Sequence, residues 1–226
     1  MKHINEILPV VIKQIEDRNM SSFVELPRNK KSLSSRKTTF GIGINDANYM
    51  TQHRVNGIIK RCPYFSKWVG ILERCYDKKR QAKAPTYIGC TVAPEWLYFS
   101  NFRKWMETKD WIGKEIDKDI LYPGNKIYSP DNCVFVDKSI NALLTSRAAM
   151  RGEYPQGVHW HKASSSFVSD ININGKKKHL GCFNTVAEAQ KAYITEKIRV
   201  IRAVQSNNPE ISEGLERHIK IMENIL

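Results

Sequence analysis

The chain has 226 residues, enough for two small domains, and its 36 Lys and Arg against 23 Asp and Glu give a formal net charge of +13. This charge exceeds what solubility requires, so we expect a polyanionic partner, and nucleic acid is favoured over a membrane surface. The five cysteines are widely spaced and form no Cys-x-x-Cys pair, which argues against a disulfide framework and a zinc site. No apolar run is long enough to span a bilayer, so we expect a cytoplasmic protein without a membrane partner.

The first half of the chain is predicted to be mainly helical. Apolar positions at helical spacing predict an amphipathic helix over residues 3–18. Residues 28–39 are rich in Lys, Arg, Ser and Thr and cannot build a core, so they form either a solvated linker or an arm that follows phosphates on DNA. Further helices are predicted over residues 64–76 and from Pro94 onward, and the aromatic side chains of the latter are expected in the core.

After Gly113 the pattern changes to short extended runs. Residues 115–121 and 133–136 predict a β-hairpin across a turn-rich connection. Asp137 can cap the helix that follows, which has Ile140, Leu143 and Leu144 on one face. Strand, strand and helix therefore follow one another, and we place a domain boundary within residues 148–156.

The last part of the chain predicts a small sheet and two helices. Three strands are expected over residues 157–168, 168–174 and 177–183, with turns at 163–166 and at Asn174-Gly175. Thr185 and Glu188 form a capping box that opens a helix, and a final helix starts near Pro209. We expect an α+β protein with four parts: an N-terminal helix and basic arm (1–59), a strand–strand–helix module (60–150), a sheet with its helix (155–205) and a C-terminal helix (207–226).

The run from Ile116 to Thr145, IDKDILYPGNKIYSPDNCVFVDKSINALLT, resembles the HNH or ββα-metal endonucleases, above all those of phages. The similarity covers about residues 60–147 and implies a ββα-metal finger embedded in helices. It also implies that Mg²⁺ or Mn²⁺ polarises a phosphodiester for hydrolysis. The matching positions are Asp117, Asn141 and Thr145 for the metal, Lys118 for the general base, and Asn132 for orienting the hairpin.

Lys118 departs from this family, which has a histidine as the general base. A lysine ammonium is protonated at neutral pH and cannot accept a proton from water, unless a bound dication or nearby Lys and Arg lower its pKa. Asp119 offers a second carboxylate to the metal or to water, and the nearest histidines in the sequence are His53 and His159. Without any catalytic role, Asp117 to Asp119 would be an exposed strand with a local charge pair, and Asn132 and Asn141 would be a turn residue and a polar helix position.

The run from Gly157 to Tyr193, GVHWHKASSSFVSDININGKKKHLGCFNTVAEAQKAY, resembles the DNA-binding domain of the APETALA and ethylene-response-factor family. The similarity covers about residues 155–200 and implies a three-stranded antiparallel sheet that packs on a helix and enters the major groove. It implies a DNA face with His159, Trp160, Lys162 and Lys177, and further phosphate or groove contacts from Lys176, Lys178 and His179. Alternatively, the lysines form a solvated hairpin tip and Trp160 packs in the core or at the sheet edge.

Three functional interpretations remain open. The first is a metal-dependent HNH-type DNA endonuclease of phage or mobile-element kind, in which one module cuts and the other holds double-stranded DNA. The second is a DNA-binding or regulatory protein on a nuclease fold that has lost its general-base histidine. The third is an interaction protein whose basic surface blocks a partner, although the sequence indicates no particular protein partner.

Overall fold

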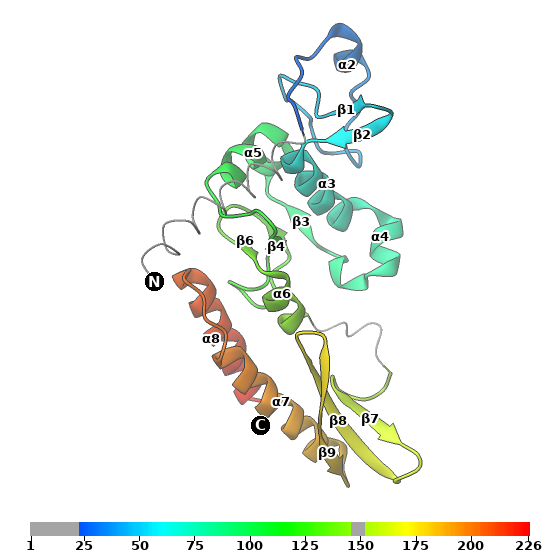
Figure 1. The fold of residues 1–226 in the computed structure, drawn as a ribbon, viewed down its shortest axis with the longest axis vertical. Helices are drawn as coiled ribbons and strands as arrows, with labels where there is room; N and C mark the ends of the chain where they lie inside the picture. Colours follow the sequence, from blue (N-terminus) through cyan, green and yellow to red (C-terminus); the bar gives the residue numbers. More distant parts are fainter. Residues whose placement is uncertain (1–22, 146–151) are drawn as a thin grey trace. The chain divides into compact units, whose positions relative to one another are not determined.

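The computed structural model describes residues 23–145 and 152–226, so the helix expected over residues 3–18 lies outside the described residues (Figure 1). The described residues form seven α-helices and several small sheets, which confirms the predicted α+β class. The described residues divide into two compact units, residues 23–81 with 89–112 and residues 82–88 with 113–145 and 152–226. None of the helices in the described ranges is both long and apolar enough to cross a membrane.

The first unit is built on aromatic side chains. Trp68 and Trp96 are fully buried, and the indole nitrogen of Trp68 donates a hydrogen bond to the Trp96 carbonyl at 2.7 Å. Phe99 and Phe102 are buried beside them, which confirms the expected aromatic core. The elements of this unit are α2 (Lys30–Ser34), β1 (Gln52–Val55), β2 (Ile58–Arg61), α3 (Pro63–Tyr76), β3 (Thr91–Val92), the 3₁₀ turn Pro94–Leu97 and α5 (Phe99–Glu107).

The helix predicted from Pro94 is in fact two pieces, because Tyr98 between them is extended. The amide of Ile44 donates to the Leu97 carbonyl at 2.7 Å, and the amide of Phe99 donates to the Ile44 carbonyl at 3.0 Å. These bonds to a distant segment replace the helical bonds at this position. Helix α3, by contrast, is confirmed over nearly the predicted residues. Helix α4 (Lys78–Lys83) and the 3₁₀ turn Pro85–Tyr87 follow it.

The second unit contains the predicted hairpin. Strand β4 (Glu115–Asp117) pairs antiparallel with β6 (Val134–Val136), with Ile116 opposite Phe135, and α6 (Lys138–Leu144) follows; β5 is Ile127–Tyr128. The first strand is shorter than predicted because the Asp117 carboxylate accepts the amides of Asp119 and Ile120 and turns the chain. Asp137 occupies the N-cap position of α6, but its side chain makes no capping hydrogen bond, so that prediction is wrong.

A three-stranded antiparallel sheet follows in the order β7 (Val158–His161), β8 (Ser166–Ile173) and β9 (Lys176–Phe183). Helix α7 (Val186–Arg202) packs on β8 and β9, and α8 (Pro209–Glu223) packs on α7 (Figure 1). The predicted capping box is confirmed, since Thr185 and Glu188 exchange hydrogen bonds at 3.1 and 3.2 Å. One core joins the hairpin, the sheet and helices α6, α7 and α8 of this unit, and its members include Ile120, Val136, Ile171, Ile198 and Leu215.

Candidate functional site

Lys118 lies at the centre of a polar network in the hairpin region. Its side chain is only 6% exposed, and its ammonium donates to both carboxylate oxygens of Asp119 at 2.7 Å and to the Asn125 carbonyl at 2.5 Å. The ammonium also lies 5.9 Å from the centre of the Tyr128 ring. In each of these contacts the ammonium is the hydrogen-bond donor. Lys118 thus links Asp119 to the Asn125 turn.

Asp117 closes strand β4 with its carboxylate. Its Oδ1 accepts the Asp119 amide at 2.7 Å and the Ile120 amide at 2.8 Å. Burial raises the pKa of Asp117, and these two backbone hydrogen bonds oppose the increase. One oxygen of the expected metal ligand is thus already used to shape the backbone.

Asn125 organises the hairpin, a role that the HNH resemblance gives to Asn132. The Asn125 amide group donates to the carbonyls of Lys118 and Ile127, both at 2.8 Å. Asn132 contacts this network through a 3.4 Å hydrogen bond from its side chain to Asn125 Oδ1. Asn125 was not among the predicted site residues, although its position after Pro123-Gly124 in the turn was a signal for a residue that bonds local backbone.

The remaining expected metal ligands lie on α6 and after it. Thr145 follows the helix and donates its hydroxyl to the Asn141 carbonyl at 2.8 Å. No hydrogen bond joins either side chain to Asp117. Across residues 23–145 and 152–226, no group of three His, Cys, Asp or Glu side chains is placed to hold a metal ion. Asp117 is the one carboxylate among the three ligands that the resemblance implies.

His218 reaches the same hairpin from α8, about a hundred positions later in the chain. Its Nε2 lies 3.1 Å from the carbonyl oxygen of Asp119. Burial lowers the pKa of His218, although the Asp119 carbonyl and the nearby carboxylates of Asp117 and Asp119 oppose this change. The imidazole is therefore neutral at pH 7 and donates its Nε2 proton to the carbonyl. The local sequence around Asp117 contains no signal for this contact.

The lowered pKa of His218 predicts a loss of stability in mild acid. The unfolded chain, with the ordinary value of 6.5, binds the proton more readily than the folded chain does. Stability is therefore complete above pH 6.5 and is lost as the pH falls through the lower pKa of the folded state. We expect the free energy of unfolding, measured in urea at several pH values, to fall less steeply with acid in His218→Gln. An unchanged slope, or an equal flattening in the exposed control His161→Gln, would contradict this role.

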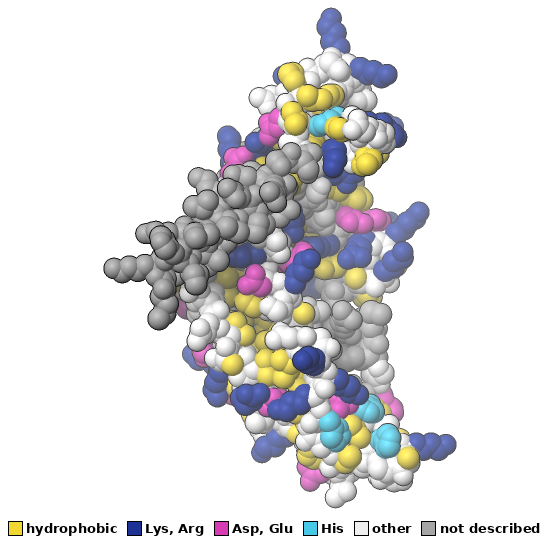
Figure 2. Space-filling view, viewed as in Figure 1, with side chains coloured by type: hydrophobic (Ala, Val, Ile, Leu, Met, Phe, Trp, Pro, Cys, Tyr) yellow, Lys and Arg dark blue, Asp and Glu magenta, His cyan; other side chains and the backbone are white. Residues whose placement is uncertain are grey.

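The three-stranded sheet has one face covered by α7 and one open face, which we define by the side chains of His159, His161, Asp170, Lys177 and His179. The assignment follows from the strand register and alternation: His179 lies opposite Asp170, whereas Ile171, on the other face, is buried in the core with α7. In Figure 2, histidine side chains gather over the sheet beside exposed Lys and Arg. The open face thus brings together three of the expected DNA contacts, His159, Lys177 and His179.

Asp170 links these three side chains. His179 Nδ1 lies 3.1 Å from Asp170 Oδ1, and the Lys177 ammonium and His159 Nδ1 lie 2.8 and 3.6 Å from Oδ2. Partial burial opposes a low pKa for Asp170, but the Lys177 ammonium and His179 outweigh it, so the pKa of this carboxyl lies below its usual value. Asp170 therefore holds the basic side chains in place and offsets part of their charge.

The other expected DNA contacts lie elsewhere. Lys178 points to the α7 face and pairs with Glu196 at 2.9 Å, and Trp160 packs edge-on against Phe167 with ring centres 4.8 Å apart. Trp160 is 43% exposed, so it packs at the sheet edge and not in the core. Exposed Lys162 follows β7 in the turn to β8, and exposed Lys176 begins β9 after the Asn174-Gly175 turn.

Comparisons of this chain with protein families, with curated proteins and with solved structures found no match.

Proposed function

We propose that this protein binds double-stranded DNA through the open face of its three-stranded sheet. The observation that carries the proposal is the cluster of His159, Lys177 and His179 on a face left open by α7, in a chain of net charge +13. Lysines on such a face supply phosphate contacts, and the sheet presents alternate side chains to a groove. Asp170 fixes the directions of the basic side chains before DNA arrives.

The strand–strand–helix formed by β4, β6 and α6 is, in this proposal, a ββα finger that serves structure and not catalysis. It has the chain order of such a finger, and the position of the general base holds Lys118 in an ion pair with Asp119. The hairpin shares one core with α7 and α8, so it supports the helix on which the sheet packs. The protein is thus a DNA-binding or regulatory protein on a degenerate nuclease fold.

Endonuclease activity is the second candidate, and one contact favours it. His218 presents a neutral imidazole beside Asp119, so a histidine from α8 is close to the position where the family has its base. Its Nδ1 retains a lone pair when Nε2 donates to the Asp119 carbonyl, so it can accept a proton.

Lys177 tests the DNA interface. We expect Lys177→Glu to weaken binding of a fluorescent DNA duplex by about tenfold in anisotropy titrations, because it replaces a phosphate contact with repulsion. The slope of log affinity against log salt should also fall by about one. The matched control is Lys220→Glu on α8, an exposed lysine away from the sheet, which should change affinity less than twofold. Equal losses in both variants would refute binding through the open face.

Supercoiled plasmid separates the two candidate functions. The full chain, Asp117→Ala and His218→Ala would each be incubated with plasmid in Mg²⁺, in Mn²⁺ and without divalent ions. We expect shifted but intact plasmid in every lane. Metal-dependent nicking that disappears in both variants would instead establish the endonuclease.

A further inference from the structure

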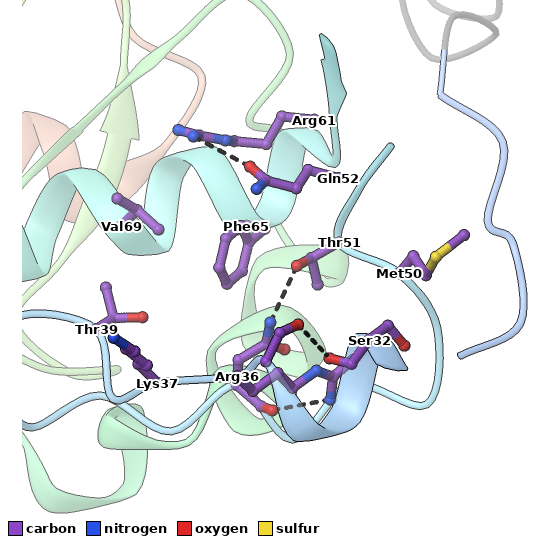
Figure 3. A pocket seen from close by; sticks show the side chains of 12 residues that line it. Ser32, Arg36, Lys37, Thr39, Met50, Thr51, Gln52, Arg61, Phe65 and Val69 are labelled. Carbon is purple, nitrogen blue, oxygen red and sulfur yellow. Dashed lines mark hydrogen bonds between the residues drawn. The ribbon is translucent and has the colours of Figure 1, made fainter. Parts of the chain in front are cut away.

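A pocket of about 380 Å³ lies in the first unit, away from the sheet and the hairpin in the sequence (Figure 3). This volume is in the range of small-molecule sites. Residues of four segments line it: α2 with the chain after it, the loop that leads into β1 with the first residue of that strand, the last residue of β2, and α3. Figure 3 shows Phe65 and Val69 on α3 facing the segment that carries Lys37 and Thr39.

The pocket has a strongly positive lining. Arg36, Lys37 and Arg61 contribute to it, and no acidic side chain is among its described lining residues. Residues 28–61 contain eight Lys and Arg but only one acid, Asp46, whose carboxylate accepts two hydrogen bonds from Ser100. Such a surrounding attracts an anion and repels a cation.

Arg36 shapes one wall of the pocket. Its guanidinium donates to the carbonyls of Asn45, Ala47 and Tyr49 at 2.9, 2.6 and 2.7 Å, so the loop curves around it. Burial and the nearby Arg28 lower the pKa of Arg36 despite Asp46, which indicates a positive charge with little compensation. The loop carbonyl oxygens therefore point toward Arg36, and hydrogen-bond donors are left to contact a ligand in the pocket.

The donors that remain available are Lys37, Thr39 and Arg61. In the part of the chain that the structure describes, neither the Lys37 ammonium nor the Thr39 hydroxyl has a hydrogen-bond or ion-pair partner. Arg61 makes one hydrogen bond, to Gln52 at 3.3 Å, and its other N–H groups are available. Beside Lys37 and Thr39, Phe65 and Val69 provide an apolar surface. Charged donors next to an apolar wall match a ligand with a phosphate at one end and a ring at the other.

We propose that this pocket binds a nucleoside phosphate, with the phosphate on Lys37 and Thr39 and the nucleoside against Phe65 and Val69. The ligand is a phosphate ester either as a free nucleotide or as one unit of a single strand. This site is separate from the proposed sheet interface and does not depend on it. It also gives a specific role to the basic segment 28–39, part of which forms α2 and the pocket wall.

Calorimetric titration of the full chain tests the pocket with three probes: adenosine 5′-monophosphate, inorganic phosphate and a short single-stranded oligonucleotide. We expect the monophosphate to bind more tightly than inorganic phosphate, because only the nucleoside reaches the apolar wall. Lys37→Glu should weaken this binding at least tenfold. The control Lys104→Glu, an exposed lysine on α5 with the same change of charge, should weaken it less than twofold, and Lys177→Glu should leave it unchanged.

The outcomes are distinct. Binding of the oligonucleotide but not the monophosphate, with the same dependence on Lys37, would support the pocket and assign it to a strand. Equal weakening by Lys37→Glu and Lys104→Glu, or no binding of either nucleotide probe, would overturn it. Inorganic phosphate that binds as tightly as the monophosphate would overturn the role of Phe65 and Val69. Lys37→Met, which adds no negative charge, should still lose affinity and so guards against a folding defect in Lys37→Glu.

Discussion

Gly214→Ala is expected to lower the free energy of unfolding by about 3 kcal/mol, because α8 meets the hairpin at this glycine without room for a methyl group. A Cβ at this position would lie 2.4 Å from the carbonyl oxygen of Ile120 and 3.0 Å from its carbonyl carbon. Both atoms belong to backbone, so a side-chain rotation cannot relieve the clash. The gain of about 1 kcal/mol from replacing glycine within a helix is smaller than this cost.

Gly70→Ala is the matched control for this prediction. Gly70 also lies inside a long helix, α3, and a Cβ there would meet nothing within 4 Å. We expect this substitution to stabilise the protein by about 0.5–1 kcal/mol through helix propensity alone. Urea denaturation followed by far-ultraviolet circular dichroism gives both values. If Gly214→Ala were as stable as the parent protein, the close packing of α8 on Ile120 would be wrong.

Local signals predicted those elements that local interactions determine. The apolar spacing of α3, the Thr185–Glu188 capping box of α7 and the Asn174-Gly175 turn all act within a few residues, and each is confirmed. Strand β4 ended early for a reason that is also local, since the Asp117 carboxylate bonds to the next two or three amides. An aspartate at the end of an extended run was therefore a signal for a turn.

Contacts between distant segments account for what sequence patterns did not predict. Hydrogen bonds with Ile44, more than fifty residues away, interrupt the helix at Tyr98. His218 on α8 contacts Asp119 in the hairpin region. Periodicity contains no information on such pairs. The same limit applies to the open face, where alternation places Lys177 but does not reveal that Asp170 would hold it.

Burial changed the interpretation of Lys118 most. In the sequence it is one of three alternating charges on a short strand, and an exposed charge pair was the simplest alternative to a catalytic role. The structure keeps the pair with Asp119 but buries the lysine end, because the Asn125 carbonyl and the Tyr128 ring surround the ammonium. The contacts of this ammonium with Asp119, Asn125 and Tyr128 all lie within the hairpin region.

Lys118→Met should therefore destabilise the protein by about 2 kcal/mol, because it leaves the Asn125 carbonyl without its donor and Asp119 without its counter-ion. The loss is limited because the Asp119 side chain is 46% exposed and water can solvate its charge. The measurement is urea denaturation of the full chain. Lys138→Met on α6 removes an exposed lysine from the same unit and should change stability by less than about 0.5 kcal/mol.

The same variant separates a structural lysine from a catalytic one. If Lys118 only supports the hairpin, Lys118→Met should bind duplex DNA as the parent protein does at a temperature where both are folded. Its effect on binding would then follow stability and appear only at temperatures where the variant is partly unfolded. A variant with unchanged stability that loses plasmid nicking would instead place Lys118 in the chemistry, and the ion pair with Asp119 would be a means of positioning it.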